Sequence, residues 1–312
     1  MPAVRPWCTP PRWGAKNGRK SVNAAALDAA LTLHVAGGTV SRSFPTTSSA
    51  FKGTLPSTDS EDAFFAKITG DPLTVRIACD GIVNAASFQR GPLAPGELVT
   101  IFGTGIGPSR LEGLQLDATG RVATSLAATR VLFDGVPSPL VYVSATQSSV
   151  IVPYAVFGKG QTVIEVEYLG SKSNTVAYPV AEAMPGLFSA AASGRGQGAI
   201  LNQDYSGNSA ANPAGRGEVV QIYATGEGQT DPPGEDGKLV GDVLPKPKAP
   251  VSVLIGGLPA ELLYAGGAPG LVAGVLQVNV RVPEGVTPGS AVPVVVIIGQ
   301  ASSQGQLTLA VL

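Results

Sequence analysis

The stretch GELVTIFGTGIG at residues 96–107 occurs again, without a gap, as GEVVQIYATGEG at residues 217–228. Seven of the twelve positions are identical, and the two segments lie 121 residues apart. A match of this length at this spacing indicates a duplicated structural unit, and a duplication defines the domain count more firmly than local propensity does. If a whole unit is duplicated, further matches must follow in the same order.

Such matches do follow along both copies. They pair RVLFDGVP (130–137) with SVLIGGLP (252–259), SVIVP (149–153) with NVRVP (279–283), TVIEVEYLG (162–170) with PVVVIIG (293–299), and the closing segments 175–180 with 306–311. The offset is 122 for the first of these pairs and rises to 130 at the second. The second copy therefore contains about eight additional residues, which we place in the glycine-rich segment GGAPGLVAG at 266–274.

Each copy consists of short runs of Val, Ile, Leu and Tyr separated by Gly, Pro, Asn, Asp and Ser, a pattern typical of many short strands. Asp-Gly at 134–135 and Gly-Gly at 256–257 tolerate positive φ and indicate tight hairpins. The sequence therefore predicts an all-β fold with two tandem immunoglobulin-like β-sandwiches, at residues 81–183 and 184–312. The segment AEAMPGLFSA at 181–190 is expected to join them.

Alternation along one strand predicts which side chains face the core. In TVIEVEY, Ile164 and Val166 fall on one side, whereas Glu165 and Glu167 fall on the other and are expected to face water. Residues 294–298 of the second copy are apolar at both parities. That pattern predicts a strand lying between the sheets and a neighbouring domain.

Composition excludes several functional classes. Of 312 residues, 40 are Gly and 26 are Pro, 44% are hydrophobic and only 14% are charged, so the chain should fold without long charged helices. A net charge of -1 gives no general attraction to nucleic acid or anionic lipid. No apolar run reaches about eighteen residues, so no transmembrane segment is expected. Cys8 and Cys79 are expected to lie outside the β-rich body and form no disulfide framework.

The first eighty residues have no counterpart in the two copies. Residues 1–26 contain Pro, Gly and Trp but no apolar run of the kind found in a secretory signal, and we expect a disordered or misassigned tail there. Residues 27–80 read as loops followed by the short alternating strand DAFFAKI at 62–68. They are expected to form a third unit or part of one.

Several motifs carry a family resemblance. They are GIVNAASF (81–88), PGELVTIFGTGIGP (95–108), MPGLFSAAASGRGQGAILNQD (184–204), NSAANPAGRGEVVQIYATGEGQTDP (208–232) and LQVNVRVPEGV (276–286). Together they resemble the uncharacterised C-terminal domain family first catalogued in Solibacter. The resemblance implies Ig-like sandwiches related to IPT/TIG modules, in large secreted or surface proteins, with no assigned activity.

A second resemblance concerns the residues upstream. VAGGTVSRSFPTTSSAF (35–51) and DAFFAKI (62–68) are similar to the last part of a bacterial β-propeller repeat of the SBBP type. A propeller blade is a four-stranded sheet that packs against other blades. The resemblance implies that this chain is the C-terminal part of a longer extracellular or cell-surface protein, whose upstream propeller is missing from the sequence.

Few residues of the sequence match a catalytic or cofactor-binding motif. His34 is the sole imidazole and has no G-x-S-x-G turn to serve, so packing or surface exposure is preferred to catalysis. Clustered Cys and His, which zinc requires, are lacking. The glycines of GTGIG (103–107), GEG (226–228) and GRGQG (194–198) precede no predicted helix, so turns are preferred to phosphate binding. No cofactor is predicted.

Two binding hypotheses concern loops of the second copy and the aromatic residues. Asp231, Glu235 and Asp236 share the loop DPPGEDG and form a weak calcium candidate, although a solvated turn is preferred. Tyrosine rings can pack on the C–H surface of sugars. Tyr154 and Tyr205 lie least within strand-like runs and are the weak candidates for sugar binding.

These observations favour a non-catalytic extracellular module with a structural or adhesive role, whose partner is an unknown protein or polysaccharide surface. The alternative is a carbohydrate-binding appendage of a secreted protein. A hydrolase domain is the third class, and it would require turnover of ester or glycoside substrates.

Overall fold

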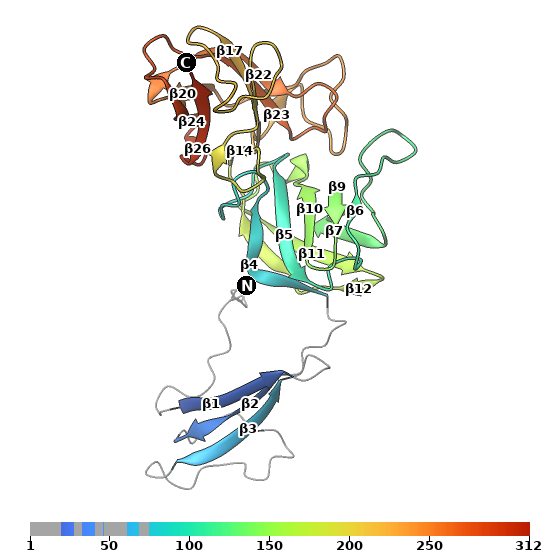
Figure 1. Cartoon of the computed structure of the whole chain (residues 1–312). Coiled ribbons are helices and arrows are strands. Elements are labelled where there is room, and N and C mark those ends of the chain that lie inside the picture. Colours follow the sequence, from blue (N-terminus) through green and yellow to red (C-terminus); the bar gives the residue numbers. More distant parts are fainter. Residues whose placement is uncertain (1–19, 28–32, 41–45, 47–60, 69–74) are drawn as a thin grey trace. The chain divides into compact units, whose positions relative to one another are not determined.

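The computed structural model describes residues 20–27, 33–40, 46, 61–68 and 75–312 (Figure 1). Its described residues form β-strands and one short 3-10 helix, η1 (Tyr154–Val156), so the prediction of an all-β fold is confirmed. The chain divides into two compact units, Met1–Thr74 and Val75–Leu312. Within the described residues, no helix has the length and apolar character needed to cross a membrane.

The first unit contains one antiparallel sheet. Its strands are β1 (Lys20–Leu27), β2 (Leu33–Thr39) and β3 (Asp62–Ile68), in that order. The strand predicted at 62–68 is confirmed. The expectation of a tail through residue 26 is wrong from Lys20 onward, because this segment pairs with β2 despite its lack of an apolar alternation. Residues 1–19, with Cys8, lie outside the described residues.

The second unit begins with a two-sheet sandwich, called here the first sandwich (residues 76–179). One sheet has the order β4-β5-β10-β9-β6 and comprises β4 (Arg76–Asn84), β5 (Leu98–Thr104), β6 (Glu112–Gly113), β9 (Leu140–Val143) and β10 (Gln147–Ile151). The other has the order β12-β11-β7-β8, with β13 also on β11, and comprises β7 (Thr129–Phe133), β8 (Val136–Pro137), β11 (Gln161–Tyr168), β12 (Ser171–Lys172) and β13 (Val176–Pro179). Cys79 lies inside β4, not outside the β-rich body as expected.

A second sandwich follows (residues 186–311). Its first sheet contains β14 (Gly186–Leu187), β16 (Ile200–Leu201), β17 (Val219–Thr225), β22 (Glu261–Gly267) and β23 (Leu276–Arg281). The strand order is β14-β17-β23-β22, and β16 also pairs with β17. Its other sheet contains β15 (Gly196–Gln197), β20 (Val251–Ile255), β21 (Leu258–Pro259), β24 (Gly289–Ile298), β25 (Ala301–Ser302) and β26 (Leu307–Val311). A separate pair, β18 (Thr230–Asp231) and β19 (Lys246–Pro247), joins two loops.

Alternation produces the core of each sandwich. In β11, Ile164 and Val166 are fully buried, whereas Glu165 and Glu167 lie on the outward face with Val163, which confirms the predicted parity. The core of the first sandwich draws apolar side chains from both of its sheets, and the second sandwich has a separate core of its own. In β24 the prediction of burial on both faces is only partly correct. One face is buried, but Val295 and Ile297 on the other face are partly exposed.

The cross-strand registers of the two sandwiches are equivalent. Corresponding pairs are Gln147–Phe102 and Gln277–Tyr223, Ile164–Phe133 and Val294–Ile255, and Leu132–Pro137 and Leu254–Pro259. Each residue of the second copy is displaced by 121, 122 or 130 positions, as the sequence match requires. A slip of one residue would exchange the core and outward faces, so agreement at three separate ladders supports one duplicated unit.

The predicted hairpins are confirmed, and they give a stability prediction. Asp134 and Gly135 both have positive φ between β7 and β8, and a Cβ built on Gly135 has no atom within 4 Å. Gly135→Val should therefore lower the free energy of unfolding by about 1–2 kcal/mol through backbone strain alone. Gly113 is the control for chemical denaturation, because it also has open space but no positive φ. Equal losses for the two valine variants would contradict the strain argument.

The predicted insertion lies in the loop between β22 and β23, and this loop contacts the first sandwich. Val272 joins a buried apolar cluster with Leu98 of β5 and Val122 of the loop that precedes β7. The Leu98 N–H donates to Thr225 Oγ1 at 2.8 Å, and the Thr225 hydroxyl donates to the Gly274 carbonyl at 2.7 Å. We call this contact between the two sandwiches the junction. The residues that distinguish the second copy from the first thus help to dock the copies together.

Candidate functional site

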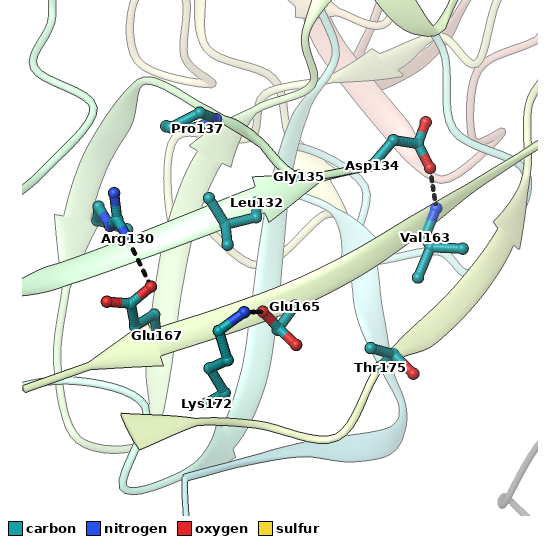
Figure 2. Close-up of a pocket in the computed structure, with 10 residues that line it drawn as sticks. All are labelled: Arg130, Leu132, Asp134, Gly135, Pro137, Val163, Glu165, Glu167, Lys172 and Thr175. Atoms are coloured by element: carbon teal, nitrogen blue, oxygen red, sulfur yellow. Dashed lines mark hydrogen bonds and ion pairs between the residues drawn. The ribbon is translucent and has the colours of Figure 1, made fainter. Parts of the chain in front are cut away.

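A groove of about 440 Å³ lies on the outward face of β7 and β11 in the first sandwich (Figure 2). Ten residues line it, namely Arg130, Leu132, Asp134, Gly135, Pro137, Val163, Glu165, Glu167, Lys172 and Thr175. Strand alternation positions these side chains, because the core takes the other parity of the same strands. Asp134 and Gly135, in the hairpin between β7 and β8, are among these lining residues (Figure 2).

Oppositely charged side chains pair across the floor of the groove. Arg130 contacts Glu167 at 2.6 Å, and Lys172 contacts Glu165 at 2.8 Å (Figure 2). The pKa of the Lys172 amine is raised, chiefly by its hydrogen bond with Glu165. Each carboxylate of these pairs already has a cation beside it, so the groove offers balanced polarity and no concentrated charge for an ionic ligand.

Asp134 lies at the hairpin end of the groove. Its carboxylate accepts hydrogen bonds from Lys159 Nζ at 2.7 Å, Thr162 Oγ1 at 3.0 Å and the Val163 N–H at 2.8 Å. Partial burial raises the pKa of Asp134, but these three donors outweigh burial and leave the pKa below its ordinary value. A carboxylate stabilised in its ionised form and already bonded to three donors is poorly suited to general acid catalysis.

The calcium candidate residues do not converge on one point. Glu235 pairs with Arg121 and, at 2.6 Å, with Lys238, while Asp236 Oδ1 accepts the Tyr154 N–H at 2.9 Å. Asp231 is exposed in β18. Within the described parts of the chain, no group of three or more His, Cys, Asp or Glu side chains is arranged to hold a metal ion. Glu235 and Asp236 instead bind groups of the first sandwich.

The two candidate tyrosines have opposite environments. Tyr154 lies in η1 and is only 6% exposed, because the second sandwich covers it. Its ring packs against Gly96 and Gly234, where any side chain would collide with it. Tyr154 therefore cannot present a ring face to a sugar, and the expectation for it is wrong. Tyr205 is 73% exposed in a turn with positive φ.

The remaining candidates occupy structural positions. His34 lies in β2, with its ring centroid 5.7 Å from that of Phe65, which agrees with the packing interpretation. Gly105, Gly226 and Gly228 have positive φ and lie in loops that strands or further loops follow, whereas Gly103 lies in β5. The preferred interpretation as turns therefore holds for Gly105, Gly226 and Gly228, but it is wrong for Gly103 and for Gly196, which lies in β15.

Sequence reasoning missed a polar face on the second sandwich. The outward face of β17, β23 and β22 contains Gln221, Tyr223, Gln277, Asn279 and Tyr264, all partly exposed. Gln277 Nε2 donates to Asn279 Oδ1 at 2.9 Å and lies at 3.4 Å from Gln221 Oε1. The alternation of polar residues in LQVNVR carried this signal, since Gln277 and Asn279 share one parity.

Comparison with models of protein families and with curated proteins finds no match for this chain. The family resemblance of residues 81–312 and the propeller resemblance of the upstream residues therefore stay predictions.

Proposed function

We propose that this chain is a non-catalytic module of a secreted or cell-surface protein, in which two immunoglobulin-like sandwiches provide a structural or adhesive scaffold. The observation that supports the proposal is the docking of two equivalent sandwiches through the junction, so that Val75–Leu312 forms one compact unit. Such a junction holds two domains as one body, which a surface that bears force or presents a ligand requires. The sheet of β1, β2 and β3 is proposed as part of a propeller blade, and its exposed Val22 and Phe65 would pack against further strands.

Surface location and lack of turnover test this proposal together. Antibodies against the purified chain should label intact cells of the source organism, and external protease should remove the signal. A panel of ester and glycoside substrates should show no turnover above buffer. Labelling that needs permeabilised cells would contradict the extracellular assignment. Turnover that copurifies with the chain and follows its concentration would contradict the non-catalytic assignment.

Carbohydrate binding is the second candidate function, and the polar face of the second sandwich favours it. On this face, the amides of Gln277 and Asn279 on β23 lie between Tyr223 of β17 and Tyr264 of β22, and Gln221 lies on β17 with Tyr223. The Tyr264 hydroxyl donates to the Gly267 carbonyl at 2.7 Å. Amides can donate to and accept from sugar hydroxyls, and aromatic rings cover C–H surface. In the first sandwich, by contrast, the junction covers apolar residues of the equivalent face, including Leu98 and Ile151.

A glycan array provides a direct test of that second function. Tyr264→Ala should weaken binding to an uncharged polysaccharide roughly tenfold, since the packing of one aromatic ring contributes up to about 1.5 kcal/mol beyond the area it buries. Tyr142→Ala is the matched control, because Tyr142 pairs with Ser149 as Tyr264 pairs with Asn279 in the other copy. If wild-type protein retains no glycan, or if both variants retain it equally, carbohydrate recognition at this face is wrong.

A further inference from the structure

Two glutamates are buried where the sandwiches meet, and neither side chain faces a basic partner. Glu97 precedes β5 in the first sandwich and Glu227 follows β17 in the second; they are 1% and 3% exposed. Glu97 accepts hydrogen bonds from Asn84 Nδ2 at 2.9 Å and from the Ala94 N–H at 2.8 Å. Glu227 Oε2 has no hydrogen-bond partner. Two carboxylates so placed would be costly to ionise in the docked state.

Glu97 is buried, whereas its equivalent in the other copy is not. Its equivalent in the second sandwich is Glu218, whose carboxylate accepts the Gly215 N–H at 2.7 Å, as Glu97 accepts the Ala94 N–H. Glu218 is nevertheless exposed. The hydrogen bond from the loop N–H is thus common to both copies. Over Glu97, Asn84 of β4 donates both to the Glu97 carboxylate and, at 3.1 Å, to the carbonyl of Met184 in the linker between the sandwiches (residues 180–185). Glu227 of the second sandwich lies close enough for its charge to act on Glu97.

Glu227 departs from the repeat. The equivalent residue in the first copy is Ile106, which is fully buried, so this position of the fold accommodates an apolar side chain. The turn that carries Glu227 packs against the linker, because the Met184 N–H donates to the Gly226 carbonyl at 2.9 Å. An ionisable group has therefore replaced an apolar one at the point where the second sandwich meets the linker.

The other polar groups of the junction do not neutralise the two glutamates. Tyr154 faces both Glu227 and Asp236, and these two negative charges add to burial in raising the pKa of its hydroxyl. Arg121 acts on Asp236 and Glu235, and Lys238 pairs with Glu235. Each glutamate therefore lies among amide, hydroxyl and carboxyl groups, and Glu97 additionally experiences the charge of Glu227.

We propose that proton binding at Glu97 and Glu227 controls docking of the two sandwiches: the junction is closed when both carboxyl groups are neutral and opens when they ionise. Opening would expose the Glu97 carboxylate and separate Glu227 from Glu97 and Tyr154, while each sandwich keeps its own core. Burial raises the pKa of each glutamate to about 8, which is consistent with this arrangement. For each glutamate, the docking constant should then fall up to tenfold per pH unit between the ordinary and raised pKa values.

Amide hydrogen exchange across the junction tests the proposal in the full chain. The Leu98 and Val122 N–H groups donate to Thr225 Oγ1 and the Gly237 carbonyl, so their protection reports docking. Ile101 and Val278 lie inside the ladders of the separate sandwiches and serve as internal references. Between pH 6 and pH 9, after correction for intrinsic rates, the junction amides should lose at least tenfold more protection than the references.

Variants distinguish titration of the glutamates from a general effect of alkaline pH. The double variant E97Q/E227Q should keep its junction protection at pH 9, whereas the matched control E218Q should lose it as wild type does. E227I tests Glu227 alone if the double variant folds poorly, because the other copy carries isoleucine there, and it should reduce the loss. Wild-type protection that does not change with pH would overturn the proposal, as would an equal loss in the glutamine and isoleucine variants.

Discussion

Gly226→Ala should destabilise the protein severely, with a loss of roughly 4 kcal/mol in the free energy of unfolding. Gly226 has φ +83, a conformation that L residues adopt only with strain. A Cβ at this position would also collide with the Met184 carbonyl oxygen. The Met184 carbonyl belongs to the backbone and cannot rotate away as a side chain could. The collision can therefore be relieved only if the linker or the end of β17 moves.

Chemical denaturation of the full chain measures this loss. Gly270→Ala is the matched control, because Gly270 has φ +76 but no atom within 4 Å of its Cβ position. The control should lose only about 1 kcal/mol, from backbone strain. If Gly226→Ala is no less stable than Gly270→Ala, the close contact between β17 and the linker does not exist as described.

The second large effect is a fall in stability as the pH rises from about 5 to about 8. Burial raises the pKa of Glu97 and Glu227 from 4.5 to about 8, although the bonds from Ala94 and Asn84 act in the opposite direction on Glu97. In this pH range the folded protein keeps protons that the unfolded chain has released. The free energy of unfolding should therefore fall by up to about 1.4 kcal/mol per pH unit for each glutamate, and level off above pH 8.

Thermal and urea unfolding from pH 5 to pH 9 check this sign. E97Q/E227Q should flatten the profile and be more stable than wild type at pH 9, because its neutral amides keep the junction closed where the two glutamates of the wild type ionise. Below about pH 4 other carboxyls act in the opposite direction, since hydrogen bonds to Asp134 and Asp117 lower their pKa values. If the stability of the wild type rises between pH 5 and pH 8, the two glutamates are not protonated and buried in the folded protein, and the account is wrong.

Much of the fold was accessible from the sequence because duplication and alternation are local signals. The ungapped match of 96–107 with 217–228 established the equivalence of β5 and β17, and the change in offset located the inserted loop. The glycine pairs at 134–135 and 256–257 located two hairpins. A strand period of two also identified the inward faces.

The junction could not be derived in the same way. Alternation separates inward from outward residues, but it does not say which outward face another domain will cover. Tyr154 is buried by residues that lie 82 positions away, as its bond to Asp236 shows, and Glu97 is buried by the following sandwich. One feature of the sequence did point to the junction: Glu227 stands where the first copy has Ile106, within an otherwise closely matched motif.

An experimental structure of the full chain, with residues 96–180 superimposed on 217–311, tests the central claim most directly. Duplication predicts that both sheets superimpose and that Gln147 pairs with Phe102 as Gln277 pairs with Tyr223. It also predicts that the additional residues of the second copy lie between β22 and β23. A different register in either ladder, or a different strand order in the two halves, would contradict the claim that one ancestral sandwich was copied.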